Sequence, residues 1–247
     1  YRSYQPGDDL RRVDWKMYAR SDRHYVRDAE VETSITVRFV LDASASMAHT
    51  EAGIKKFDYA RFMIAALGYL AHQHGDAIGL EALSNVTVAH LPPKREPQQL
   101  HRLLHELERL EPHGGWPQPS HWQRMLETAQ RRELLVIVSD VHEYEREITD
   151  ALSKFRALHH EVILFQILGR AEVEFRHEGF LTLEDLETGR TVEIEGAAAR
   201  RSYLTAMQSR LAEVKRTLQN QDIAYELFFL EQPLDFALRR YLTQRMK

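Results

Sequence analysis

Short apolar runs typical of buried β-strands alternate along this chain with longer stretches in which apolar residues recur at helical spacing. Residues 35–41 are rich in β-branched side chains, and residues 134–138 are continuously apolar, as expected of a strand covered on both faces. Between them, residues 56–74 place apolar side chains on one face of a predicted helix. Strands that alternate with helices form a mostly parallel sheet with right-handed crossovers. The sequence therefore predicts an α/β fold with a doubly wound, mostly parallel sheet.

The same alternation extends to the rest of the chain. Residues 86–90 follow the turn Ser84-Asn85 and are predicted to form a hairpin strand at the sheet edge, ended by the breaker at residues 91–93. The other strands are predicted at residues 77–83, 161–167 and 223–230. The other helices are predicted at residues 100–110, 147–159 and 204–218, in a segment that ends near residue 132, and after Pro233.

Residues 171–195 break this rhythm and are predicted to form a small inserted β subdomain. Strand-like runs at residues 173–175, 180–183 and 191–194 surround the turn at residues 187–190. The insertion is rich in acidic residues, which suits either a surface for a partner or a cap over an edge of the sheet. These acidic residues are Glu172, Glu174, Glu178, Glu184 and Asp185.

Composition limits what the chain can do. It has 247 residues and no cysteine, which excludes a disulfide scaffold, cysteine-ligated zinc or iron–sulfur sites and thiol catalysis. Its most apolar stretch, residues 62–75, is shorter than the roughly 20 residues that span a bilayer, so no membrane span is expected in this chain. We expect a cytoplasmic location, with membrane association through parts of a longer protein outside this sequence left open.

The charge balance argues against nucleic-acid binding. The chain has 33 Lys and Arg against 37 Asp and Glu, a formal net charge of −4, which does not favour a general polyanion binder. Residues 1–27 interleave seven Lys or Arg with aromatic residues, a pattern that can bind single strands, but four Asp in the same segment favour a salt-bridged arm. No nucleic-acid partner is therefore expected.

Two acids directly follow strands that are predicted to be parallel. Asp42 follows the first strand and precedes Ser44 and Ser46. Asp140 stands in the same way after the continuous apolar run. The carboxyl ends of parallel strands share one edge of a sheet, and hard oxygen donors there suit Mg²⁺ or Mn²⁺ better than Zn²⁺. The alternative that the spacing leaves open is that Asp42 and Ser44 cap the following helix.

Two motifs resemble known families. Asp42-x-Ser44-x-Ser46 after an apolar strand resembles the metal-ion-dependent adhesion site of von Willebrand factor A domains. Residues 4–15, which read Tyr-x-Pro-Gly-Asp-Asp-x-Arg-x-x-Asp-Trp, are similar to the opening signature of the bacterial "domain of unknown function fifty-eight" family, whose members carry a von Willebrand A-like domain.

This second resemblance covers essentially the whole chain. Further segments that resemble the family lie at residues 57–60, 75–76, 184–189 and 233–235. The resemblance implies a leading arm, residues 1–34, and a von Willebrand A-like, Rossmann-type domain, residues 35–247, that contains the insertion at residues 171–195.

The resemblance also implies a metal site for Mg²⁺ or Mn²⁺, in which an acidic residue of a partner often completes the shell. The residues at the ligand positions are Asp42, Ser44, Ser46 and Asp140. Where a Thr ligand is expected, this chain has Trp116, whose indole nitrogen only donates hydrogen bonds. Ser120, Glu143 or a water are the candidate substitutes for the missing Thr.

The function implied by the resemblance is binding rather than catalysis. Family members are commonly encoded beside MoxR-type AAA+ ATPases, so we expect an adaptor that works with such an ATPase in chaperone-like assembly or maturation of a client protein. Two alternatives stay open: a metal-dependent hydrolase that uses Asp42, Asp140 and His142, and an adaptor that needs no metal.

Candidate partner contacts come from the opening signature and from the loop predicted at residues 112–119, which contains Trp116. The four charged residues of the signature alternatively form a network that anchors the arm. The candidates are Asp8, Asp9, Arg11, Asp14 and Trp116.

Overall fold

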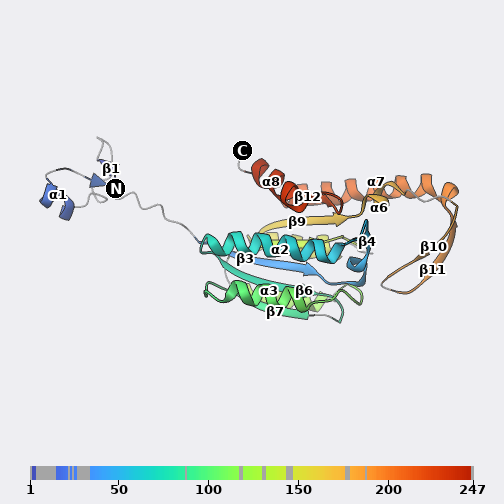
Figure 1. The fold of residues 1–247 in the computed structure, drawn as a ribbon, viewed down its shortest axis with the longest axis horizontal. Helices are drawn as coiled ribbons and strands as arrows, with labels where there is room; N and C mark the ends of the chain where they lie inside the picture. The colour runs from blue at the N-terminus through green and yellow to red at the C-terminus, as the bar shows by residue number, and fades with distance from the viewer. Residues whose placement is uncertain are drawn as a thin grey trace. The chain divides into compact units, whose positions relative to one another are not determined.

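The structure is a computed structural model, and it divides the chain into two compact units, Tyr1–Thr33 and Ser34–Lys247. In the described part of the first unit, α1 (Trp15–Ser21) accompanies an antiparallel pair, β1 (Arg2–Ser3) and β2 (Tyr25–Val26) (Figure 1). The described residues are 2–3, 15–21, 23, 25–26, 34–86, 88–116, 119–129, 132–142, 147–175, 179–186 and 188–245.

The second unit is built on a six-stranded sheet (Figure 1). From one edge to the other the strands are β12 (Ala224–Phe229), β9 (Glu161–Leu168), β8 (Leu134–Ser139), β3 (Thr36–Asp42), β6 (Ala77–Leu83) and β7 (Val88–Lys94). Every neighbouring pair is parallel except β6 with β7. This order confirms the predicted α/β fold and the antiparallel strand at the sheet edge.

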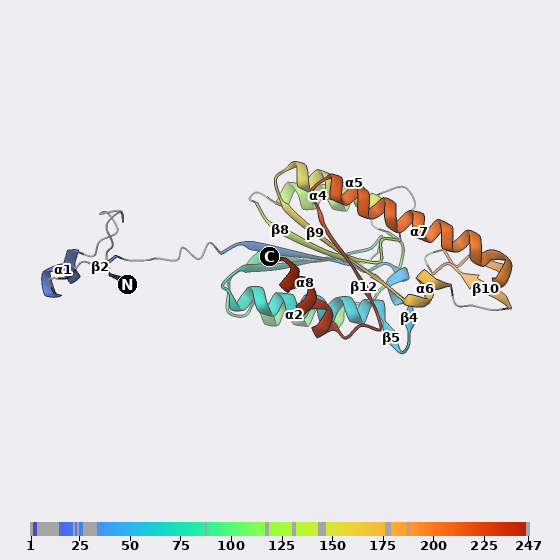
Figure 2. The same cartoon turned by 90° about the horizontal axis from the view of Figure 1, so that it is seen from above.

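Helices cover both faces of the sheet, as Figure 2 shows. On one face lie α2 (Lys56–Gln73), α3 (Gln99–Arg109) and α8 (Leu234–Arg245), and on the other lie α4 (Pro119–Thr128), α5 (Glu147–Ala157) and α7 (Gly196–Asn220). The two faces hold two separate apolar clusters. Val136 and Val138 of β8 enter the first cluster, whereas Leu135 and Ile137 enter the second. The continuous apolar run of this strand is therefore the consequence of burial on both faces.

The strand β7 departs from the sequence prediction. It continues through Pro92 and Pro93, which were expected to end it. A proline lacks the N–H that a ladder needs, but β7 is the last strand of the sheet, and its pairing with β6 shifts register between Ile78 and Leu80. An irregular edge strand is a place where the sheet tolerates proline.

The insertion is a short helix followed by a hairpin. The expected strand at residues 173–175 is wrong, because α6 (Arg170–Glu174) is helical there. The Glu172 carboxylate accepts the Gly169 N–H at 2.6 Å and so satisfies a donor at the start of this helix. The two other predicted strands are present as β10 (Phe180–Glu184) and β11 (Thr191–Glu195), which pair antiparallel.

Apolar length was the sequence criterion for a membrane span. Among the described residues, no helix combines the length and apolarity needed to cross a membrane.

Candidate functional site

The two strand-end acids lie at one edge of the sheet. Asp42 ends β3, and Asp140 follows β8, its parallel neighbour. Both side chains are buried. The structure therefore brings together the two carboxylates that the strand-end argument placed at one edge.

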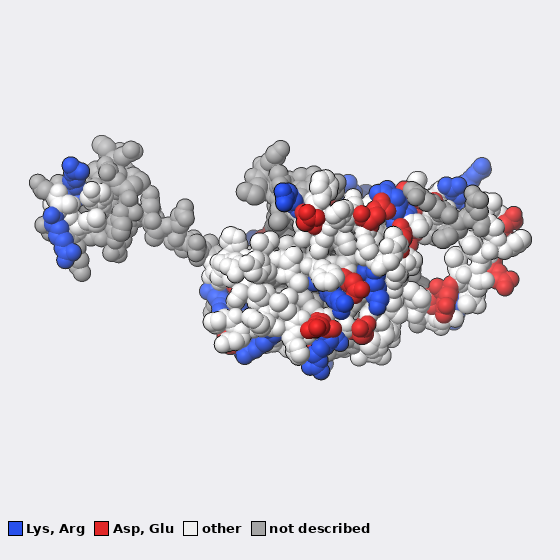
Figure 3. Space-filling model, viewed as in Figure 1, with Lys and Arg blue, Asp and Glu red and all other residues white. Residues whose placement is uncertain are grey.

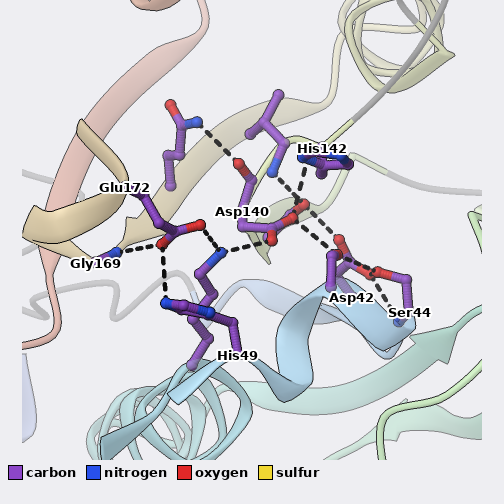
Figure 4. Close-up of polar contacts among 12 residues, drawn as sticks. Asp42, Ser44, His49, Asp140, His142, Gly169 and Glu172 are labelled. Carbon is purple, nitrogen blue, oxygen red and sulfur yellow. Dashed lines mark hydrogen bonds and ion pairs between the residues drawn. The ribbon is translucent and has the colours of Figure 1, made fainter. Parts of the chain in front are cut away.

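Two serines connect these carboxylates. The Ser44 hydroxyl donates to Asp42 Oδ1 at 2.6 Å and lies 2.9 Å from the Ser46 hydroxyl. The Ser46 hydroxyl in turn donates to Asp140 Oδ1 at 3.3 Å. We call Asp42, Ser44, Ser46 and Asp140 the site edge; Figure 4 shows Asp42, Ser44 and Asp140 at its centre.

The backbone after β3 holds this arrangement. Ser44 is extended, and the short 3₁₀ helix η2 (Ala45–Ala48) begins directly after it. The Ser44 N–H donates to Asp42 Oδ1 at 2.9 Å, a local bond that turns the chain back over the end of the strand. The Ser44 side chain makes no capping bond to η2, so the alternative that it caps the following helix is wrong.

A lysine that sequence reasoning missed occupies the other side of Asp140. Lys56 is the first residue of α2, is only 2% exposed, and donates from Nζ to Asp140 Oδ2 at 2.9 Å. The same Nζ donates to Glu172 Oε1 of α6 at 2.7 Å. Figure 4 shows Glu172 and Asp140 on opposite sides of the ammonium nitrogen that contacts both carboxylates.

The two buried carboxylates of the site edge have pKa values that are shifted in opposite directions, because Lys56 pairs with only one of them. Burial alone would lower the pKa of Lys56, but the charges of Asp140 and Glu172 outweigh it and raise the pKa. Burial likewise acts to raise the pKa of Asp140, yet the adjacent Lys56 lowers it. Among the described residues no such cation is paired with Asp42, and burial together with the charge of Asp140 raises the pKa of Asp42 to about 6.

Ser139 is a second residue that the sequence analysis missed. Its hydroxyl donates to Asp42 Oδ2 at 2.6 Å and accepts the Val141 N–H at 2.8 Å. Both oxygens of Asp42 are therefore engaged inside the protein. Its position immediately before Asp140 could have predicted this role. Ser139 is the last residue of β8, and the last residues of neighbouring parallel strands lie at the same edge of the sheet as Asp42 and Asp140.

The loop that contains Gly114 and Trp116 lies beside the site edge, but residue 116 brings no oxygen ligand. The Ala45 N–H donates to the Gly114 carbonyl at 2.7 Å, which fixes the loop next to η2. Trp116 is half-buried and stacks on Trp122, with ring centroids 5.7 Å apart. Its side chain packs against the apolar cluster that contains Trp122 and stays partly exposed, so its role as a partner contact stays a prediction.

The other predicted site residues lie elsewhere. Ser120 is exposed in the first turn of α4. Glu143, Asp8, Asp9, Arg11 and Asp14 lie outside the described residues.

The residues present do not fit the ligand set that the resemblance implies for Mg²⁺. Lys56 holds one oxygen of Asp140, both oxygens of Asp42 accept hydrogen bonds, and Trp116 replaces the Thr. Across the part of the chain that is described, no three His, Asp or Glu side chains are grouped so that they could hold a metal ion. Binding of Mg²⁺ or Mn²⁺ stays a prediction for experiment.

His142 lies next to the site edge. Its backbone N–H donates to Asp140 Oδ1 at 3.2 Å, and its side chain is exposed and lines a cleft. The hydrolase alternative uses His142 with Asp42 and Asp140, and it stays a prediction for experiment; Asp42 is buried, and its two oxygens accept hydrogen bonds from Ser44 and Ser139.

The cleft has a volume of about 590 Å³ and opens between the site edge and the hairpin β10–β11. Its inner wall includes Ser46 and Lys56. Its outer wall carries Leu183, Leu186 and Val192, which are 39%, 47% and 57% exposed. Figure 1 shows the hairpin reaching from the end of α7 towards the end of the molecule where β4 (Thr50–Glu51) lies.

Comparison with known proteins finds relatives of the sequence and of the fold. An uncharacterised protein of Mycobacterium tuberculosis, Rv1480, is 28% identical over 230 residues, which are 88% of this chain and 69% of that protein. BatB, a conserved hypothetical protein from Bacteroides thetaiotaomicron, has a similar structure with a TM-score of 0.55 and 12% identity, covering 85% of this chain and 98% of that one. An aerotolerance-related membrane protein from Bacteroides fragilis matches with a TM-score of 0.52 and 12% identity, covering 84% and 96%.

The structural likenesses, at 12% identity, establish the fold alone. The sequence establishes more, because the family model described as protein of unknown function DUF58 matches residues 1–213. That range includes the opening signature, the site edge and most of α7. The chain therefore belongs to the DUF58 family, as its opening signature indicated.

Proposed function

We propose that this chain is a protein-interaction module that binds its partner in the cleft between the site edge and the hairpin β10–β11. Membership of the family is consistent with an interaction module. The observation that carries the proposal is the composition of the cleft wall, in which three exposed apolar side chains face buried charged and hydroxyl groups. Exposed apolar residues beside a few fixed polar groups are typical of recognition sites.

The proposed partner is a MoxR-type AAA+ ATPase, and the proposed role is that of an adaptor for a client protein. The proposed location is the cytoplasm. A nucleic acid is a poor candidate, because Lys and Arg are mixed with Asp and Glu over the face drawn in Figure 3. Figure 3 also shows acidic side chains over the hairpin, where Glu184, Glu193 and Glu195 lie.

The proposed interaction does not need a metal ion. Lys56 already supplies a positive charge to Asp140, so the adaptor without metal agrees better with the geometry than an adhesion site completed by Mg²⁺. The module binds rather than catalyses, since the buried acids are engaged in hydrogen bonds and ion pairs.

Binding to a purified MoxR-type ATPase from the same organism tests the proposal. Leu186→Asp and Val192→Asp place charges on the hairpin wall of the cleft. Each is expected to raise the dissociation constant for the ATPase roughly tenfold or more. Leu104→Asp is the matched control, because Leu104 is equally apolar, is 41% exposed and lies on α3, outside the cleft. Unchanged binding in both hairpin variants, measured by biolayer interferometry, contradicts the cleft as the interface.

A further inference from the structure

Lys56 stands where a lysine is unfavourable for two separate reasons. It is the first residue of α2, and the N-terminus of a helix carries partial positive charge that repels a cation. Its side chain is only 2% exposed, and a buried ammonium is costly unless it is paired. The stability of a charged lysine in this position therefore depends on the anionic groups that pair with its ammonium.

The carboxylates that form ion pairs with Lys56 come from two distant parts of the chain. Asp140 lies 84 residues further along, at the end of β8, and Glu172 lies 116 residues further along, in α6 of the insertion. The contacts are 2.9 Å and 2.7 Å long. The Lys56 backbone also contributes, because its N–H donates to the His49 carbonyl at 3.0 Å and fixes the start of α2 against η2.

A divalent ion at the site edge would compete with this arrangement. It would have to bind Asp140 while Lys56 holds the same carboxylate, so two cations would repel each other in a buried site. It would also need the oxygens of Asp42, which already accept bonds from Ser44 and Ser139.

We propose that the ammonium group of Lys56 is the permanent cation of the site edge, taking the role that a divalent metal ion has in metal-ion-dependent adhesion sites. Lys56 then joins three elements, since one Nζ holds the end of β8, the start of α2 and the helix that leads into the hairpin. This proposal concerns the chemistry of the site edge and holds whichever partner binds.

One consequence concerns how a partner meets the site edge. Glu172 is 24% exposed and covers the outer side of the Lys56 ammonium. A carboxylate of a partner that enters the cleft meets Glu172 rather than an open coordination position. Removal of divalent ions is therefore expected to leave partner binding unchanged.

Thermal melting and calorimetric titration with Mg²⁺ and Mn²⁺ test the proposal on the whole chain. The wild type, stripped with EDTA and dialysed, is expected to show no saturable heat and no shift in Tm when either ion is added. A one-to-one binding isotherm, with a Tm increase of roughly 3–6 °C at ten times its dissociation constant that is lost in Asp42→Ala, overturns the proposal.

Variants at two adjacent lysines give the second arm. Lys56→Met leaves Asp140 and Glu172 without their cation and is expected to lower Tm by several degrees, whereas Lys55→Met removes a neighbouring charge with little effect. Equal Tm values for the two variants contradict the proposal. If Lys56→Met does not fold, the ion titration of the wild type decides alone. Neither arm uses a partner, so failure here is distinguishable from failure of the proposed function.

Discussion

His160 is a buried histidine whose protonation the fold opposes. It is 2% exposed, its Nδ1 accepts the Glu133 N–H at 3.2 Å, and its ring meets the edge of Phe155. Burial lowers the pKa of His160, and the charge of Arg38 acts in the same direction against that of Glu133. The native protein therefore holds this imidazole neutral.

The sign of the pH effect follows from this lowered pKa. Below about pH 6.5 the unfolded chain binds a proton at His160 more readily than the native protein does, so the free energy of unfolding falls as the pH falls. Urea denaturation at pH 7.5 and 5.5 is expected to show a smaller loss for His160→Gln than for the wild type. His74→Gln, at an exposed position after α2, is the control and is expected to lose as much as the wild type. Equal losses in all three proteins would rule out His160 as the source.

Arg38 forms a buried charged network in the middle of the sheet. Its Nη1 donates to Glu81 at 2.8 Å and its Nε to Glu133 at 2.7 Å, and all three side chains are buried. Arg38→Met removes the cation that Glu81 and Glu133 share and leaves Glu81 only its contact with His90 Nδ1 at 2.7 Å, so we expect a loss of about 3–5 kcal/mol in the free energy of unfolding. Arg102→Met breaks an exposed pair with Glu96 and is expected to change little. Similar losses from both variants, measured by urea denaturation, would contradict the importance of burial.

At the site, the sequence predicted the residues that follow strands and missed those that reach in from helices. Asp42 and Asp140 could be paired because parallel strands end at a common edge. Lys56 and Glu172 could not, since no local pattern tells which way the first turn of a helix faces or where a distant insertion docks. A lysine at a helix N-terminus, where the dipole disfavours it, was the available signal.

Elements that are buried on both faces were the easiest to predict. The strands β3, β8 and β9 are mostly apolar because both faces are covered, and their observed bounds lie close to those predicted. The insertion was harder, because α6 has five residues and is fixed by polar contacts, among them those of Glu172 with Gly169 and of Glu51 with the Ala171 N–H, rather than by an apolar period. The apolar period of residues 204–218 predicted the long helix α7 but not how much of it is buried. Its buried residues are Gly196, Val214 and Leu218.

The hairpin β10–β11 is an element that the fold can lose. Within the described residues, neither apolar cluster contains a residue of the hairpin, and Phe180 at its start is 89% exposed. The hairpin also begins and ends at one point, because the Gly196 N–H donates to the Gly179 carbonyl at 2.8 Å. A short linker can therefore replace it without moving α7.

Replacement of residues 180–195 by a Gly-Ser linker is expected to change Tm by less than about 3 °C, since little apolar area is lost from the core. The same variant is expected to lose binding to the MoxR-type ATPase, because the outer wall of the cleft is gone. Thermal melting and biolayer interferometry measure the two effects separately. A folded variant that binds like the wild type would contradict the assigned role of the hairpin.

For the whole molecule, alternation of strands and helices was enough to predict the class of fold, because right-handed crossovers place helices on both faces of a parallel sheet. The division of the chain was a weaker inference, since the opening signature resembles the family but carries no apolar period of its own. The structure divides the chain into two compact units between residues 33 and 34.

The second unit contains a complete core, and this predicts that it folds alone. The described residues of both apolar clusters lie between Val37 and Leu238, so no described core residue belongs to the first unit. A fragment of residues 34–247 is expected to melt within about 2 °C of the whole chain, because it keeps every described residue of both apolar clusters. If the charged residues of the opening signature contact the partner, the fragment binds the ATPase more weakly at the same Tm. A fall of more than about 5 °C would show instead that the signature anchors the first unit to the core.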